Sequence, residues 1–216
     1  MILTRIFFIL LCMLSLGACK EEYTYPNVLT ELTEIQTDAK GQLKELTTDR
    51  GEVFTIVQQQ ANNKFVADTL YRMLTIYEPI IGQTNQILVH SAQSVLSEIP
   101  IPASSFEEGI KTDPVDIQSI WKSGNYLNMI LLVQTKDKPH VFHFVDQGIS
   151  LLGNGKRKVL DLTIHHDRKG DYEAFTTKYC FSIPLKTFKH KMQEGDLIRF
   201  HLNTYKEGVT TREFKF

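Results

Sequence analysis

Apolar and polar residues alternate along most of the chain after residue 114, which is the pattern of strands that bury one face. The apolar positions are rich in Val, Ile, Leu, Phe and Tyr, and Gly- and Asn-containing turn sequences separate several of the runs. About seven short strands in roughly 100 residues predict a two-sheet β-sandwich of immunoglobulin-like size. The expected strands are residues 117–121, 126–134, 140–145, 159–165, 172–183, 197–205 and 210–216.

Shorter β-rich runs with turn residues between them occupy the preceding part of the chain. Residues 43–48 lead through Asp49-Arg50-Gly51 into residues 53–57, which is a hairpin signal with Gly at the end of the turn. Residues 70–77 and 86–96 are predicted to be further strands. About five strands in fewer than ninety residues fit a small closed barrel, so the whole chain is predicted to be all-β.

The two halves of the chain carry opposite charge. Residues 28–114 hold 6 Lys and Arg against 12 Asp and Glu, a net charge of −6, whereas residues 115–216 hold 16 against 11, a net charge of +5. The change coincides with Ile99-Pro100-Ile101-Pro102 and the polar residues 104–114, which interrupt the strand pattern. We therefore expect a barrel domain at residues 28–114 and a sandwich domain at residues 115–216.

The N-terminal segment has the pattern of a secretory signal that ends in a lipidation site. Arg5 precedes the apolar run of residues 6–16, and Gly17-Ala18 are small residues directly before Cys19. This run is shorter than the ~20 residues that a membrane-spanning helix needs, and a plain signal peptide does not require a cysteine at the junction. We predict that residues 1–18 are removed and that Cys19 carries a lipid anchor at the start of a tether, residues 19–27.

The charged residues Lys20, Glu21 and Glu22 follow the predicted lipidated cysteine. They resemble the short export signals, a lysine followed by acidic residues, of surface lipoproteins of the Bacteroidetes. This resemblance implies an outer membrane lipoprotein exposed on the cell surface. The alternative is an ordinary charged tether, with the protein on the periplasmic face of the outer membrane.

The most prominent candidate for a metal site is His165-His166-Asp167 with Asp171 nearby, because imidazole and carboxylate groups are zinc ligands. Adjacent residues of a strand point to opposite faces, so His165 and His166 would not converge. The alternative is a polar turn in which Asp167 and Asp171 accept hydrogen bonds from main-chain amides and Gly170 supplies a positive φ. We expect no metal and no cofactor.

No nucleophile elbow, phosphate-binding loop or Cys–His pair with supporting context is recognisable, so we do not predict an enzyme. Cys180 lies in an apolar alternating run and is predicted to be a buried small side chain. The net negative charge of the barrel half opposes binding to nucleic acid. Lys156-Arg157-Lys158 is predicted to be a solvated loop, although its charge could meet anionic headgroups or glycans.

Several motifs of this chain resemble those of NigD-like proteins of the Bacteroidetes. They are the lipobox, Asp49-Arg50-Gly51, Trp121, Gly124-Asn125-Tyr126-Leu127-Asn128, His165-His166-Asp167 with Gly170-Asp171, and Phe181-Ser182-Ile183-Pro184-Leu185. The resemblance implies an N-terminal barrel of the oligonucleotide/oligosaccharide-binding (OB) type and a C-terminal immunoglobulin-like sandwich. The family takes its name from a gene in a bacteriocin-associated cluster, and membership implies no reaction, ligand or catalytic residue. The resemblance assigns a role to one residue only, which is Cys19 as the site of lipidation.

These features together predict a lipid-anchored protein of the cell envelope that is not an enzyme. It is expected to be a binding or accessory module that contacts the membrane through the lipid on Cys19 and an envelope protein or glycan through its surface. The alternative is a bacteriocin-associated immunity lipoprotein, which would require a cognate toxin gene nearby.

Overall fold

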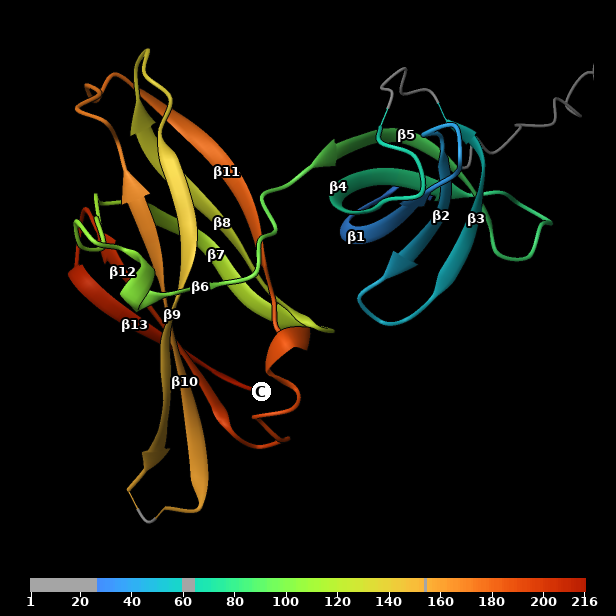
Figure 1. The fold of residues 1–216 in the computed structure, drawn as a ribbon. Helices are drawn as coiled ribbons and strands as arrows, with labels where there is room; N and C mark the ends of the chain where they lie inside the picture. Colours follow the sequence, from blue (N-terminus) through green and yellow to red (C-terminus); the bar gives the residue numbers. More distant parts are fainter. Residues whose placement is uncertain (1–26, 60–64, 154) are drawn as a thin grey trace, which may run out of the picture.

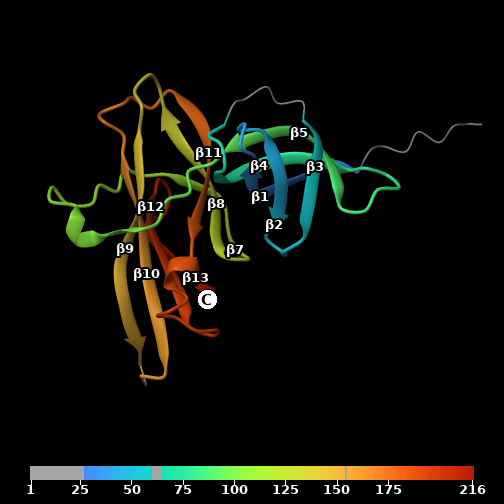
Figure 2. The ribbon, with the colours of Figure 1, turned by 45° about the vertical axis from the view of Figure 1, so that its right-hand side comes forward.

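The computed structural model describes residues 27–59, 65–153 and 155–216. A β-barrel and a β-sandwich follow each other along this part of the chain and lie side by side in both views (Figures 1 and 2). The predicted lipidation site Cys19 and the candidate export residues Lys20, Glu21 and Glu22 lie outside the described residues. Within the described ranges, no helix is both long enough and apolar enough to span a bilayer.

The barrel closes in the strand order β1-β2-β3-β5-β4, with β1 also paired to β4. The pairing of β3 with β5 is parallel, whereas the other neighbours run antiparallel. Buried side chains such as Ile35, Leu46, Met73 and Val89 fill the interior. The strands are β1 (Leu29–Thr37), β2 (Leu43–Thr48), β3 (Val53–Gln59), β4 (Leu70–Pro79) and β5 (Gln86–Ser94). The predicted closed barrel is therefore confirmed, and the ranges named from the sequence match β2 to β5.

The sandwich packs a sheet of order β13-β12-β10-β9-β6 against a sheet of order β11-β8-β7. Strict alternation produces the core, as in β12, where Ile198, Phe200 and Leu202 are buried and the residues between them are more exposed. The strands are β6 (Ile101–Pro102), β7 (Asp116–Ser123), β8 (Tyr126–Thr135), β9 (Val141–Leu152), β10 (Arg157–Asp167), β11 (Phe175–Pro184), β12 (Leu197–Thr204) and β13 (Gly208–Lys215). Short 3₁₀ turns are η1 (Ala103–Ser105) and η2 (Lys186–Phe188). The predicted sandwich is confirmed.

The segment between β5 and β7 is hydrogen-bonded to the sandwich, which corrects the boundary expected near residue 114. Strand β6 pairs in parallel with β9 at the edge of its sheet, and Thr112 and Val115 form isolated bridges with His166 and Thr204. Proline is tolerated on an edge strand because one side of the main chain has no neighbour to donate to. The prolines therefore end the barrel pattern without ending strand pairing, and the boundary lies between β5 and β6.

Strands β9 and β10 form a hairpin that is longer than the sequence pattern indicates. Opposite Asp161 and Leu162 the register shifts by one residue, because Gln147 is an extra residue between Asp146 and Gly148. Gly148 has a φ of +109°, which a glycine adopts without strain. Beyond the bulge β9 continues to Leu152, and the hairpin extends past the positions where β6 and β12 pair with it.

Candidate functional site

Side chains from distant parts of the sequence meet between the barrel and the sandwich around Arg72 of β4. The Arg72 guanidinium donates to both carboxylate oxygens of Asp49 at 2.7 and 2.8 Å. It also donates to Ser182 Oγ at 2.9 Å and to Asn128 Oδ1 at 3.1 Å. Only 2% of the Arg72 side chain is exposed. Because each donor faces an acceptor, the burial of this charge is compensated.

The face of the Arg72 guanidinium lies 3.9 Å from the centre of the Tyr126 ring. The Tyr126 hydroxyl donates to Glu34 Oε1 at 2.6 Å, and burial together with this carboxylate raises the pKa of Tyr126 above its usual range. We call Glu34, Asp49, Arg72, Tyr126, Asn128 and Ser182 the interdomain cluster. Its polar groups are occupied by one another, so its role is to hold the barrel against the sandwich.

Gly124 lies at the edge of this cluster and has a φ of +53°. A Cβ atom there would lie 2.7 Å from the carbonyl oxygen of Asp49, which is too close for any side chain without a shift. The Asp49-Arg50-Gly51 turn of the barrel and the Gly124–Asn128 motif of the sandwich are thus in contact at the boundary between the two domains. Both motifs are recognisable in the sequence, whereas Arg72 is marked only as the single cation of β4.

The adjacent residues His165 and His166 point to opposite faces of β10, as the strand pattern predicts. His166 lies inside, where its Nε2 is 2.9 Å from His140 Nδ1 and its Nδ1 is 2.8 Å from the carbonyl oxygen of Asp113. Burial lowers the pKa of His166. His165 lies on the other face, where it stacks on Phe106 with ring centroids 4.9 Å apart.

The row of hydrogen bonds from His166 continues through His140 to Asp171, with 3.2 Å between His140 Nε2 and Asp171 Oδ2. The carbonyl oxygen of Asp113 can only accept, so His166 donates from Nδ1 and accepts at Nε2 when neutral. The two imidazole rings and the Asp171 carboxylate therefore form one row of contacts that links the end of β10 to the loop before β9.

Asp167 and Asp171 hold the turn that follows β10, as the polar-turn interpretation of the sequence proposed. Asp171 accepts from the main-chain N–H groups of Lys136 and Asp137 at 2.6 and 3.2 Å, and Asp167 accepts from that of Lys169 at 2.8 Å. Gly170 has a φ of +66°. Burial alone would raise the pKa of Asp171, but the main-chain donors and His140 lower it overall.

Cations also neutralise Asp167 at this end of the sandwich. Hydrogen bonds from Lys111 Nζ at 2.8 Å and from Lys169 lower the pKa of Asp167 well below its usual range. In the part of the chain that the structure describes, no group of three or more His, Cys, Asp or Glu side chains is arranged to hold a metal ion. The histidines and carboxylates here connect loops.

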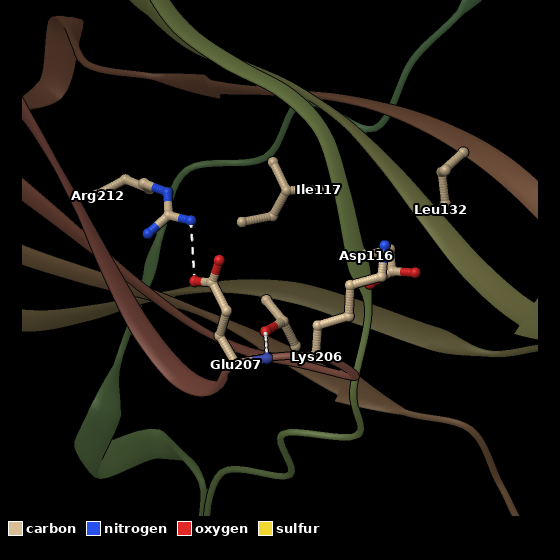
Figure 3. A pocket seen from close by; sticks show the side chains of 7 residues that line it. Asp116, Ile117, Leu132, Lys206, Glu207 and Arg212 are labelled. Atoms are coloured by element: carbon tan, nitrogen blue, oxygen red, sulfur yellow. Dashed lines mark hydrogen bonds and ion pairs between the residues drawn. The ribbon is translucent and has the colours of Figure 1, made fainter.

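A cavity of about 330 Å³ opens between β7, β8 and the β12–β13 hairpin (Figure 3). Its lining combines the apolar side chains of Ile117 and Leu132 with charged side chains of both signs, and Arg212 donates to Glu207 at 3.1 Å. The lining residues are Asp116, Ile117, Leu132, Thr204, Lys206, Glu207 and Arg212. Within the described residues, the side chains of Asp116 and Lys206 form no hydrogen bond or ion pair. They remain available to a ligand with polar groups of both signs.

A second hollow of about 430 Å³ lies between the domains, where Leu74 and Leu96 face Tyr179 and Cys180. Cys180 is half-buried, and this burial raises the pKa of its thiol. A nucleophilic cysteine needs a lowered pKa, so this environment is that of a packing residue rather than a reactive thiolate.

Comparison with known proteins agrees with this architecture. The model of the NigD-like C-terminal beta sandwich domain matches residues 98–216, which begin just before β6. No curated protein sequence matches the chain.

Solved structures extend the likeness to the barrel. A NigD-like immunity protein from Bacteroides caccae is 30% identical with a TM-score of 0.72, and the match covers 90% of this chain and 99% of that one. A protein of unknown function from Bacteroides vulgatus is 16% identical with a TM-score of 0.69, covering 88% and 91% of the two chains. A candidate lipoprotein from Bacteroides fragilis is 14% identical with a TM-score of 0.57, covering 88% and 97%. The last two show the fold alone, whereas the family model and the B. caccae structure establish that this chain belongs to the NigD-like family.

Proposed function

We propose that the protein is a lipid-anchored, non-enzymatic binding or accessory module of the outer membrane. The observation that carries this proposal is the lipobox Leu16-Gly17-Ala18-Cys19, in which small residues precede a cysteine after a short apolar run. A cysteine bearing several acyl chains exceeds the roughly two signals that stable membrane anchoring needs.

We expect an envelope partner to contact the sandwich at the cavity of about 330 Å³ shown in Figure 3, which we call the cleft. Asp116 and Lys206 offer one carboxylate and one ammonium group, and Ile117 and Leu132 add apolar surface to the same lining. A neutral glycan would leave the charges without partners, whereas a protein segment with side chains of both signs would satisfy them. The cleft therefore favours an envelope protein over a neutral glycan.

Metabolic labelling with a fatty-acid analogue tests the anchor. The wild type should be labelled, whereas Cys19→Ala should stay unlabelled and keep its signal segment, because the thiol is the group that is acylated. Protease added to intact cells then reports the face of the membrane, since we expect Lys20, Glu21 and Glu22 to direct export to the surface. Equal labelling of both variants would contradict the proposal.

The cleft is tested in the same cells by chemical cross-linking. Asp116→Lys should abolish recovery of a cross-linked envelope protein, while Lys178→Gln, an exposed change elsewhere on the sandwich, should not. Labelling should be unaffected in both variants. If Asp116→Lys leaves the same cross-linked product, the cleft is not the contact.

Immunity to a bacteriocin is the second candidate function, favoured by the name of the B. caccae protein that is 30% identical to this chain. This role requires a toxin gene beside the gene for this protein. Cells lacking the protein should then be killed by the toxin at concentrations that the wild type survives. Equal survival would leave the accessory role.

A further inference from the structure

Exposed Lys and Arg side chains gather at one end of the sandwich, which we call the basic end. It comprises the tip of the β9–β10 hairpin, the loop that contains η2, and the ends of β7 and β13, and Figure 1 shows the hairpin tip, η2 and the C-terminus at this end. Its exposed cations are Lys122, Lys156, Arg157, Lys158, Lys186, Lys189, Lys191 and Lys215.

Hydrogen bonds and a shared hollow join these segments into one surface. Lys158 Nζ donates to the carbonyl oxygen of Lys191 at 2.6 Å, which ties the hairpin to the η2 loop. A cavity of about 360 Å³ lies at this end, and its lining includes Lys122 and Lys189 together with Glu194 and Phe216. The end of β7 and the η2 loop therefore share one hollow, and the hairpin is joined to them through Lys158.

The loop that contains η2 also carries two acidic residues, Glu194 and Asp196. Asp196 is buried, and its carboxylate accepts from the main-chain N–H groups of Lys158 and Gln193, both at 2.9 Å. Glu194 is exposed on the same loop. A solvated loop would account for cations alone, but it would not account for the apolar residue beside them.

That residue is Leu151, which is 64% exposed near the tip of β9. Strand β6 pairs with β9 only at Val145 and Asp146, and β12 pairs with β10 only from Val159 onward, so neither strand covers the tip. Leu151 pairs across the hairpin with Lys158. A protruding aliphatic side chain among lysines matches the interfacial region of a bilayer, where the apolar group enters and ammonium groups remain at the headgroups.

We propose that the basic end docks on a bilayer surface that carries anionic phospholipid headgroups, with Leu151 entering the interface. An anionic glycan would satisfy the cations but would leave Leu151 in water. The inference does not depend on acylation of Cys19. Where the chain is anchored, docking fixes which way the sandwich faces.

Cosedimentation with vesicles tests the proposal, using the unlipidated mature chain from residue 20. The chain should bind phosphatidylcholine vesicles containing about one third phosphatidylglycerol, and should not bind phosphatidylcholine alone. Replacing Lys156, Arg157 and Lys158 together by Gln should weaken binding about 100-fold, because each cation near an anionic surface contributes roughly a fivefold factor. High salt should weaken it too, since the screening length falls to about 3 Å at 1 M.

Matched variants separate specific docking from general charge. Replacing Lys40, Lys44 and Lys178 by Gln removes the same charge from other exposed positions and should change binding only a few-fold. Leu151→Ser should weaken binding several-fold, whereas Val209→Ser, at an exposed valine elsewhere, should not. Equal losses in the two triple variants would overturn the proposal. So would binding to immobilised dextran sulfate without binding to the vesicles, which would assign this surface to an anionic glycan.

Discussion

The interdomain cluster and the basic end are both built from charged side chains, but they use charge in opposite ways. In the cluster, Arg72 is buried and its donors meet Asp49, Asn128 and Ser182. At the basic end, exposed cations follow one another with little acid between them. The first arrangement pairs a buried cation with a carboxylate, whereas the second places several cations on the surface of the sandwich. The motifs Asp49-Arg50-Gly51 and Gly124–Asn128 thus mark the assembly of the domains.

The largest effect should come from breaking the buried pair. Arg72→Ala removes the cation that faces the Asp49 carboxylate, together with its hydrogen bonds to Asn128 and Ser182, and we expect the free energy of unfolding to fall by about 3 to 5 kcal/mol. Arg50→Ala is the matched control on the adjacent turn, because the Arg50 side chain is 63% exposed in its ion pairs with Glu31 and Glu52. Urea unfolding followed by circular dichroism measures both. Similar losses in the two variants would contradict the claim that the buried Arg72 stabilises the fold much more than the exposed Arg50 does.

A smaller effect should follow from adding a methyl group where Gly124 meets Asp49, without changing any charged side chain. Gly124→Ala adds a Cβ atom 2.7 Å from the Asp49 carbonyl oxygen at a φ of +53°, and we expect a loss of about 2 to 3 kcal/mol. Gly82→Ala is the control, because its φ is +79° but no atom lies within 4 Å of the added Cβ. It should lose about 1 kcal/mol from backbone strain alone. If both variants melt at the same temperature, the contact between the domains is not tight.

The smallest effect should be a change in how steeply stability depends on pH, caused by Asp171 in the turn that follows β10. Because the pKa of Asp171 is lower in the folded protein, its stabilisation is complete above about pH 4, the unfolded value, and is lost as pH falls further. Asp171→Asn should therefore show a flatter decline of the urea midpoint below pH 4 than the wild type. Asp137→Asn, whose side chain is 65% exposed, should decline like the wild type. Parallel curves for all three proteins would show that Asp171 is not coupled to folding.

Local pattern predicted much of this fold. The alternation in residues such as 197–205 predicts β12 because one face of that strand is buried, and the sequence from Asp167 to Asp171 predicts a turn because its carboxylates accept hydrogen bonds from nearby amides. The interdomain cluster could not be predicted, since Arg72 and Ser182 are 110 residues apart in the chain. The pairing of β6 with β9 could not be predicted for the same reason. The prolines indicate that the local strand pattern is interrupted, but they do not indicate which sheet edge the segment joins.

One part of the basic end could be predicted from the sequence, and the rest could not. Lys156-Arg157-Lys158 is visible in the sequence as a charged run. Its joining to Lys191 and Lys122 depends on where the η2 loop and the end of β7 lie in the sandwich. The exposure of Leu151 depends on how far β9 continues beyond the positions where β6 and β12 pair with the hairpin.

The position of the interdomain cluster on the barrel determines how a mechanical load passes through the molecule. Glu34 of β1 and Arg72 of β4 are directly paired across the two strands, and each holds the sandwich, through Tyr126 and Ser182 respectively. Tension applied to the N-terminus enters at β1 and acts along the β1–β4 ladder in shear. It reaches the sandwich at the interdomain cluster, midway along that ladder, where Asp49 of the β2–β3 turn also accepts from Asn128.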